Sequence, residues 1–346
     1  MIEVANFANN TTNIFFGKTG INMQLEDILI ITIGSLSALT VLTLMISYVC
    51  YAMAYMRHGK GAGDPYTGTD KKSFEPFRDK CRSLIKELCD TDFEEIRIKS
   101  HDGLSLYGRY YHVADGAPLE IQAHGYRSYS RRDFSGGGLE ALKRGHNLLL
   151  IDQRSHGLSE GRSISFGILE RKDILSWVNF AVERFGENIK IILVGISMGA
   201  ATVLMASELD LPKNVRCVIA DCPYSSPKEI IMRVVKRKKL PPKIMFPFLW
   251  LGGRIFGGFD ICEASAEDAV RRSKIPTLII HGECDRLVPC YMSEKIFENC
   301  NMKKKRLATF PDATHGLSFF YDNERYMNEV REFTDDALSE EDTDEN

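Results

Sequence analysis

The sequence KIILVGISMGAAT, residues 190–202, decides the fold of this chain. The run that ends at Val194 is short and apolar, as buried parallel strands are. Glycines stand two residues before and two residues after Ser197, and small alanines follow. A serine on a sharp turn from strand to helix needs neighbours without bulky side chains, because otherwise the turn cannot close. The stretch therefore predicts a buried strand, a turn that presents the Ser197 hydroxyl above the sheet, and a helix.

A second stretch, GLSEG at residues 157–161, has the same spacing of glycines around Ser159. It follows the polar segment Asp152–His156 instead of an apolar run, so its serine does not stand at the end of a strand. We interpret it as a solvated turn after a strand at residues 148–151. Ser197, and not Ser159, is therefore the candidate nucleophile.

A serine hydroxyl is a weak nucleophile at neutral pH and needs a base, together with an acid that orients the base. Two later apolar runs, at residues 276–282 and 306–310, each lead into a polar turn; Asp285 follows the first and His315 the second. We expect His315 to take the serine proton and return it, and Asp285 to orient the imidazole. His315 alone would indicate only a histidine in a surface loop, but the order of the three side chains favours catalysis.

Backbone N–H groups that stabilise a developing negative charge are expected on both sides of this serine. Met198 N–H stands at the predicted start of a helix, and Tyr126 N–H follows a predicted strand at residues 119–124. Gly125 lets the backbone approach a substrate carbonyl closely. Met198 and Tyr126 are therefore the predicted oxyanion-hole donors. His124 is expected to hold this loop by packing or hydrogen bonds, and not to act in catalysis.

Five motifs in this order resemble the α/β-hydrolase superfamily, and they are most similar to its monoglyceride-lipase, serine-aminopeptidase and prolyl-oligopeptidase-like branch. The resemblance covers roughly residues 93–331. Within it, Ser155 stands where the family usually has glycine, in a segment that is normally structural. The motifs are HG at 124–125, DQRSHG at 152–157, GISMG at 195–199, HGECDRLVP at 281–289 and His315.

The resemblance implies the α/β-hydrolase fold, with a mostly parallel central sheet, flanking helices and a helical lid inserted over the nucleophile. Such folds host esterases, lipases, thioesterases, peptidases and acyltransferases, so the fold does not identify the substrate. The alternation of apolar runs and helical stretches agrees with an α/β class that opens on an antiparallel pair of strands. Strands are expected near residues 94–100, 104–112, 119–124, 147–152, 190–195, 215–221, 276–281 and 306–310. Helices are expected near residues 138–144, 168–185, 198–209, 264–273, 291–299 and 323–335.

The sequence gives no indication of a cofactor or of a nucleic-acid partner. It contains no metal-ligand spacing and no phosphate-binding glycine loop, so neither a metal nor another cofactor is expected. A formal net charge of −3 gives no indication of a nucleic-acid partner. Nine cysteines, an odd number, fit a reducing compartment better than an oxidising one.

A long apolar segment precedes the hydrolase-like region. Residues 28–56 contain no charged side chain, and about 20 apolar residues suffice to cross a bilayer. Tyrosines near its end suit a membrane interface. A cleaved signal peptide is the alternative, because Ala52-Met-Ala54 resembles a cleavage site, but the preceding region is acidic and the run is too long. The segment therefore predicts one N-terminal transmembrane helix.

The chain divides into five predicted segments. Lys18 is the only basic residue before the apolar segment, whereas Arg57, Lys60, Lys71 and Lys72 follow it, so the positive-inside rule places the hydrolase domain in the cytoplasm of a single-pass protein. The segments are a short N-terminal segment (1–27), a transmembrane helix (28–56), a linker (57–75), an α/β-hydrolase domain (76–337) with its lid at about 225–262, and an acidic disordered tail (338–346).

The predicted lid is unusual in charge. Seven basic residues between positions 228 and 243 precede a run rich in aromatic and aliphatic side chains at 244–256. One interpretation is a solvated basic helix with ordinary lid packing. The other is a lid that rests on the anionic cytoplasmic leaflet and offers an apolar mouth to lipid-like substrates.

Three functions remain open from the sequence alone. The first is a membrane-anchored serine hydrolase that cleaves carboxylic esters of medium or long acyl chains, with a small acyl ester or lipid as substrate and membrane lipid as a partner. The second is a serine peptidase that uses the same residues. The third, a scaffold without activity, is disfavoured because serine, histidine and aspartate are all present.

Overall fold

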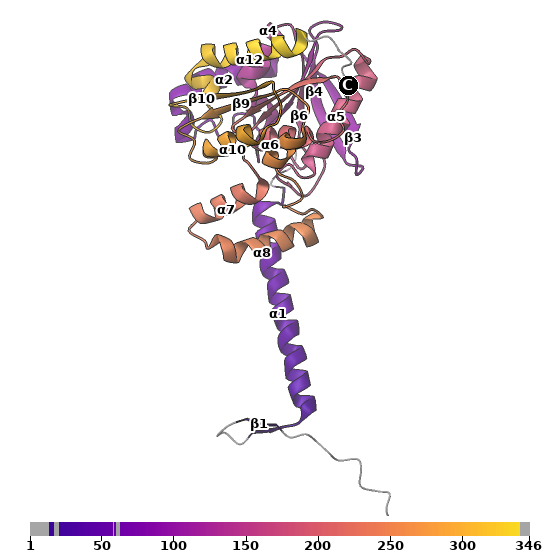
Figure 1. Ribbon diagram of the computed structural model, residues 1–346, viewed down its shortest axis with the longest axis vertical. Coiled ribbons are helices and arrows are strands. Elements are labelled where there is room, and N and C mark those ends of the chain that lie inside the picture. Colours follow the sequence, from indigo (N-terminus) through magenta and orange to yellow (C-terminus); the bar gives the residue numbers. More distant parts are fainter. Residues whose placement is uncertain (1–13, 17–20, 58, 60–62, 340–346) are drawn as a thin grey trace, which may run out of the picture.

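A computed structural model describes residues 14–16, 21–57, 59 and 63–339 of the chain (Figure 1). A globular head contains a large sheet with helices on both faces, and one long helix projects from it. Residues 1–13 and 17–20 of the predicted N-terminal segment lie outside the described part, and so do Lys60 and the residues of the predicted acidic tail after 339. Lys18 is among these residues.

The central sheet has eight strands in the order β10-β9-β8-β7-β5-β6-β4-β3. Strands β5 to β10 run parallel, and β3 and β4 form the antiparallel pair expected from their alternating sequences. Each predicted strand is present within two residues of its expected bounds. The strands are β3 (Glu94–Lys99), β4 (Ser105–Tyr111), β5 (Leu119–Ala123), β6 (Asn147–Asp152), β7 (Ile191–Ile196), β8 (Val215–Asp221), β9 (Thr277–Gly282) and β10 (Lys305–Phe310). A separate hairpin joins β1 (Ile14–Phe16) and β2 (Ile21–Met23).

Helices cover both faces of this sheet. One layer of helices packs on the face of the sheet that α6 (Met198–Ala206) covers. The second layer, which includes the last helix of the chain, packs on the opposite face. The first layer contains α5 (Glu170–Phe185), α6, α9 (Ala266–Arg272) and α10 (Tyr291–Asn299); the second contains α2 (Arg78–Asp90), α4 (Ser135–Lys143) and α12 (Asn323–Ser339). Short helices α3 (Ser130–Asp133) and α11 (Ser318–Tyr321) connect them to neighbouring loops.

Four helical expectations need correction. Helix α2 was not predicted, although Cys81, Ile85 and Leu88 recur at helical spacing and are the buried face of an otherwise polar helix. Helix α6 ends at Ala206, three residues earlier than expected, and α4 begins at Ser135, three residues earlier than expected. Helix α12 ends at Ser339, four residues later than expected, so residues 338–339 of the predicted tail are helical. Part of the predicted linker also has regular structure, because residues 72–77 form the 3₁₀ helix η2.

The lid consists of α7 (Pro227–Arg237), α8 (Pro242–Gly252) and the single π-helical turn η3 (Gly253–Gly257). The hydroxyl of Ser226 caps the start of α7 by accepting the N–H of Glu229. Helix α8 crosses the long helix α1 at close range, because a Cβ on Gly252 would lie 2.5 Å from the carbonyl oxygen of Ser47 (Figure 1). The lid is therefore packed against the projecting helix.

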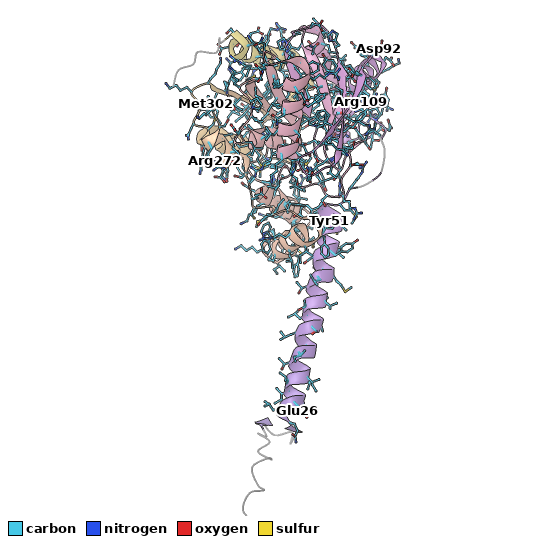
Figure 2. The ribbon with its side chains drawn as sticks, turned by 90° about the vertical axis from the view of Figure 1, so that its right-hand side faces the viewer. Glu26, Tyr51, Asp92, Arg109, Arg272 and Met302 are labelled. Carbon is cyan, nitrogen blue, oxygen red and sulfur yellow. The ribbon has the colours of Figure 1, made fainter. Side chains whose placement is uncertain are left out.

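Helix α1 (Leu25–Ala54) corresponds to the predicted transmembrane segment, beginning three residues earlier and ending two residues before its predicted limit. Its first part carries exposed leucine, isoleucine and valine side chains, and the helix is long and apolar enough to cross a membrane. Its last part is different, since Ser47, Cys50 and Tyr51 are buried against the head. Figure 2 shows Tyr51 at this junction and Glu26 at the far end of the helix.

Candidate active site

Ser197 lies on the turn between β7 and α6, with a backbone φ of 56° that non-glycine residues seldom adopt. The two glycines of the motif are required by space. A Cβ on Gly199 would lie 1.8 Å from the carbonyl oxygen of Ala123, and one on Gly195 would lie 2.3 Å from that of Gly199. The turn thus holds Ser197 in a strained conformation beside β5, as the sequence predicts.

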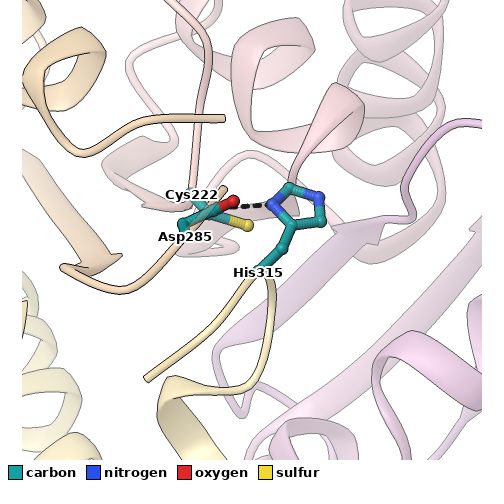
Figure 3. Close-up of side chains that lie close together, drawn as sticks. All are labelled: Cys222, Asp285 and His315. Atoms are coloured by element: carbon teal, nitrogen blue, oxygen red, sulfur yellow. Dashed lines mark hydrogen bonds and ion pairs between the residues drawn. The ribbon is translucent and has the colours of Figure 1, made fainter. Parts of the chain in front are cut away.

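The three predicted side chains come together at the carboxyl ends of their strands. His315 Nε2 lies 2.9 Å from Ser197 Oγ, and His315 Nδ1 lies 2.5 Å from Asp285 Oδ2. Figure 3 shows the imidazole of His315 directed at the Asp285 carboxylate. A histidine in this position can accept the serine proton at Nε2 while its Nδ1–H donates to the carboxylate.

The Asp285 carboxylate is buried and tightly held. Its Oδ1 accepts the backbone N–H groups of Leu287 and Val288, at 2.8 Å and 2.9 Å. Burial acts to raise the pKa of Asp285, but hydrogen bonds from His281 and His315 hold it well below its ordinary value. Asp285 therefore stays ionised, as an acid that stabilises an imidazolium must.

His281 is a part of the site to which sequence reasoning gave no role. Its ring is fully buried, with Nδ1 2.6 Å from Ser293 Oγ and Nε2 2.8 Å from the carbonyl oxygen of Val288. Nε2 also lies 3.4 Å from Asp285 Oδ2. His281 thus ties the loop that carries Asp285 to the end of β9. The sequence signal that could have indicated this role is the position of His281 in the HGECD stretch, four residues before Asp285.

The two predicted oxyanion donors flank Ser197. Within the described part of the chain, neither the Tyr126 N–H nor the Met198 N–H donates a hydrogen bond, so both remain available to a ligand. Gly125 is in close contact with the serine, since a Cβ there would lie 3.4 Å from Ser197 Cβ. The backbone of the loop at Gly125 therefore packs directly against the serine, next to the predicted donor Tyr126.

Buried side chains hold this loop in place. His124 Nδ1 donates to the Gly125 carbonyl oxygen at 2.8 Å, and Asp133 Oδ2 accepts the Gly125 N–H at 2.8 Å. His156 Nε2 accepts the Arg127 N–H at 3.0 Å, and burial lowers the pKa of His156 to about 3, which keeps the ring neutral. The expectation that His124 acts structurally agrees with these contacts.

Ser159 occupies a different environment, and the prediction of a solvated turn is wrong. The residue is only 1% exposed. Its hydroxyl donates to the Asp152 carbonyl oxygen at 2.5 Å and accepts the Tyr107 N–H at 2.8 Å. The loop closes over the end of β4, which the sequence pattern did not reveal. The hydroxyl is saturated by backbone groups, so it remains unsuited to be a nucleophile.

Two groups of side chains in the described part of the chain lie close enough to be considered as metal ligands. One joins Cys222 to Asp285 and His315 (Figure 3). There, His315 Nδ1 already donates to Asp285, and burial raises the pKa of the Cys222 thiol well above its ordinary value. The other joins His101, Asp102 and Asp173, and the Arg154 guanidinium bridges both carboxylates. Protein hydrogen bonds account for both groups.

Asp221, at the end of β8, is a further buried residue beside the serine that sequence reasoning missed. Its carbonyl oxygen accepts the Ser197 N–H at 2.8 Å, and its Oδ2 accepts the Tyr326 hydroxyl at 3.1 Å. Oδ1 has no hydrogen-bond partner among the described residues. Burial raises the pKa of this carboxyl to about 6. The only signal was an acidic residue that closes an apolar strand.

Comparison with known proteins agrees with this geometry. A family model described as alpha/beta hydrolase fold matches residues 123–259, and one described as serine aminopeptidase, S33, matches residues 258–320. The uncharacterized protein YqkD of Bacillus subtilis is 27% identical over 56% of this chain and 64% of its own length. Protein bem46 of Schizosaccharomyces pombe is 28% identical over 49% of this chain and 52% of its own length. The chain thus spans about half to two thirds of the curated relatives it matches.

A solved structure extends the similarity to nearly a whole domain. The esterase Pf2001 of Pyrococcus furiosus superposes with a TM-score of 0.60 at 25% identity, over 72% of this chain and 93% of that protein. With its sheet order, its serine turn and these matches, the chain belongs to the α/β-hydrolase superfamily.

Proposed function

We propose that this protein is a membrane-anchored serine hydrolase that cleaves carboxylic esters with lipid-like acyl chains. The observation that carries the proposal is the unbroken hydrogen-bonded sequence from Ser197 Oγ through His315 to Asp285. A scaffold without activity has no need to keep a strained serine, a hydrogen-bonded imidazole and an ionised buried carboxylate aligned.

The reaction follows from the positions of these groups. His315 Nε2 takes the Ser197 proton as Oγ attacks the ester carbonyl carbon, and the carbonyl oxygen becomes an oxyanion that Tyr126 N–H and Met198 N–H stabilise. The imidazolium gives its proton to the departing alcohol, leaving an acyl-serine. Water then attacks the acyl-serine, with His315 again as base, and releases the carboxylic acid and the free Ser197 hydroxyl.

Esters are favoured over amides by the similarity to a solved esterase at 25% identity. The match of residues 258–320 to a serine aminopeptidase family supports the second candidate, a peptidase with the same residues. An amide demands more from the acid step because an amine must be protonated as it leaves, whereas the arrangement of Ser197 and His315 is the same for both substrates. Substrate turnover, and not geometry, separates the two.

Lengths along α1 support membrane anchoring and a lid at the bilayer surface. At 1.5 Å per residue, the stretch of about 20 residues from Ile28 to Ser47 rises about 30 Å, the thickness of a hydrocarbon core. Helix α8 crosses α1 at Ser47, so it lies at the level of the headgroups when α1 spans the bilayer. Exposed apolar side chains there include Leu240, Ile244, Ile255 and Phe256.

Basic side chains beside this apolar surface fit the same arrangement. Residues 236–239, of sequence KRKK, are exposed at the end of α7. Each basic residue near an anionic leaflet contributes about 1 kcal/mol to binding. We place the lid and the hydrolase head on the cytoplasmic side, where anionic lipid and the positive-inside rule agree.

A substrate panel tests the proposed activity. Purified full-length protein in lipid nanodiscs is assayed against p-nitrophenyl esters from acetate to palmitate, monoacylglycerols and aminoacyl p-nitroanilides. We expect turnover of esters that rises with acyl length, an initial burst of one p-nitrophenol per active site, and little anilide cleavage. Faster turnover of the anilides would make the protein a peptidase, and turnover of neither class would contradict the proposal.

A charge variant tests the proposed lid contact. Replacing residues 236–239 with glutamine should lower turnover of long-chain esters in vesicles rich in anionic lipid, and about 1 M salt should remove the difference. The matched control replaces exposed lysines on the opposite side of the head, Lys80 and Lys86 on α2 and Lys143 on α4, with glutamine. Equal effects from the two sets, or no effect of salt, would overturn the lid contact but not the hydrolase.

A further inference from the structure

The last turn of α1 ends against the loop that carries one oxyanion donor. The last carbonyl groups of an α-helix have no partner within the helix and must be satisfied from outside. Here the Tyr126 hydroxyl donates to the Ala54 carbonyl oxygen at 2.7 Å. The Arg127 Nη2 donates to the carbonyl oxygens of Met53 and Met56, at 2.9 Å and 3.2 Å. Two adjacent loop side chains therefore cap the membrane helix.

One of these two residues, Tyr126, supplies a backbone donor to the proposed oxyanion hole, and Arg127 is its neighbour in the chain. The Tyr126 hydroxyl contacts α1, and its backbone N–H is the proposed donor beside Ser197, so one residue joins the two places. Arg127 follows it in a positive-φ conformation of 50°, which is strained and needs to be held from outside. The Tyr126 ring stacks on Phe166 at 4.9 Å, and Phe166 in turn meets the ring of Tyr55, just beyond α1, edge-on at 5.9 Å.

Other contacts fix the end of α1 to the head independently of this loop. Ile164 donates its N–H to the Tyr55 carbonyl oxygen, and the Tyr51 hydroxyl lies 2.7 Å from Ser163 Oγ. Arg57 donates to the carbonyl oxygens of Gly157 and Ser159, at 2.6 Å and 2.7 Å. The helix end is thus attached firmly enough to serve as a fixed support for the loop.

We propose that the end of α1 is a positioning element of the active site, acting through the Tyr126 hydroxyl and the Arg127 guanidinium. Both side chains set where the Tyr126 N–H lies relative to the developing oxyanion, although neither touches the substrate. The inference rests on the proposed serine hydrolase. It adds that the membrane helix takes part in turnover and does not merely tether the enzyme to a bilayer.

Two hydroxyl deletions on full-length protein in nanodiscs test this role. Tyr126→Phe keeps the N–H and the stacked ring but removes the bond to Ala54. Tyr51→Phe, the matched control, removes a bond between α1 and the head that does not reach the loop. With a short soluble ester, we expect Tyr126→Phe to lower kcat about tenfold or more with an unchanged KM, because small displacements of an oxyanion donor are costly. Tyr51→Phe should retain wild-type kcat.

Transition-state binding distinguishes positioning from a structural role. For Tyr126→Phe, the inhibition constant of a trifluoromethyl ketone, whose adduct resembles the tetrahedral intermediate, should rise by the same factor as kcat/KM falls. Arg127→Gln should behave in the same way, and Arg127→Lys, which still reaches a carbonyl oxygen, should recover part of the loss. The Arg127 pair keeps the inference testable if Tyr126→Phe does not fold.

Three results would overturn the inference. Wild-type kcat in folded Tyr126→Phe or Arg127→Gln would show that the helix end does not position the donor. Equal losses in Tyr51→Phe and Tyr126→Phe would show that general attachment of α1 matters, and not the loop. Wild-type protein that neither turns over esters nor reacts with a fluorophosphonate would remove the proposed function itself, a failure visible before any variant is made.

Discussion

Two stretches of this chain share the Gly-x-Ser-x-Gly pattern and differ in what their serine hydroxyls contact. Ser197 stands at a strand end with φ 56°, and its hydroxyl lies 2.9 Å from an imidazole nitrogen. Ser159 is 1% exposed, and backbone groups of Asp152 and Tyr107 saturate its hydroxyl. The comparison shows that the partner of the hydroxyl determines whether the serine can act as a nucleophile or has a structural role. The strand that precedes the motif determines which partner the hydroxyl meets.

Deletion of the two hydroxyls should give the largest contrast. Ser197→Ala should lower ester turnover by about 10⁴-fold or more, because the members of such a triad act as a unit. Ser159→Ala should change turnover per folded molecule by less than about threefold, since its hydroxyl has no base. Initial rates normalised to folded protein measure both. Substantial turnover by Ser197→Ala would break the comparison.

Removal of the base should be about as severe. His315→Ala is expected to lose about 10⁴-fold in kcat, because Oγ then has no group to take its proton. The control is His112→Ala, at an exposed histidine after β4. Its turnover should match wild type. An active His315→Ala enzyme would assign the base to another residue.

Substitution of the second glycine of each motif compares the two turns by their effect on the free energy of unfolding. Gly199→Ala places a Cβ 1.8 Å from the backbone of β5, which cannot move, so we expect a loss of about 3 kcal/mol or more and no activity. In Gly161→Ala the first obstacle is the Ser155 hydroxyl at 2.5 Å, and φ is 122°. Denaturant unfolding should show a loss of about 1–3 kcal/mol, with normal turnover in the folded fraction. Normal stability of Gly199→Ala would contradict the geometry of the turn.

Asp221 should make the surroundings of Ser197 sensitive to pH. Its pKa is raised from an ordinary value of 3.8 to about 6, so the folded state favours the protonated acid. Its contribution to stability is fully present below about pH 4 and is lost as pH rises through 6, a change of about 3 kcal/mol. Asp221→Asn, which imitates the neutral acid, should remove this fall in unfolding free energy between pH 4 and pH 7. An identical pH profile in the variant would contradict the assignment.

The smallest expected effect is structural and belongs to Ser159. Ser159→Ala removes a hydroxyl that accepts the Tyr107 N–H and leaves that donor buried without a partner. We expect a loss of about 1–2 kcal/mol in the free energy of unfolding, measured by urea denaturation. Stability equal to wild type would mean that water replaces the hydroxyl. Either way, Ser159 would remain a structural residue and not a nucleophile.

Much of the fold was predictable because its signals are local. Apolar runs predicted six of the eight strands, alternating patterns predicted β3 and β4, and the glycines around Ser197 predicted the turn. The chain order of Ser197, Asp285 and His315 predicted three side chains that do meet. Helix α2 was not predicted because its three buried residues lie in a largely polar stretch. The burial of Ser159 was not predicted because it depends on a contact with β4, about 50 residues earlier in the chain.

The contact between α1 and the loop at residues 125–127 was not predictable because it also joins segments that are far apart in the chain. Tyr126 and Ala54 are 72 positions apart, and nothing local in either stretch indicates that a tyrosine hydroxyl caps the long apolar helix. The roles of His281 and Asp221 also arise from packing. His281 holds the loop after its own strand and contacts Ser293 on α10. Asp221 accepts the Ser197 N–H at the end of the neighbouring strand β7. Sequence patterns locate strand ends, but the contacts between strand ends depend on the order of strands in the sheet.

Covalent labelling of the nucleophile tests the central claim most directly. Full-length protein is treated with a fluorophosphonate, digested with trypsin and sequenced by tandem mass spectrometry. The two motifs fall on different peptides, residues 191–213 and residues 155–162. We predict one adduct per chain, on Ser197 within the first peptide, and no adduct in the His315→Ala protein. An adduct on Ser159, or a wild-type protein that remains unlabelled, would contradict the account.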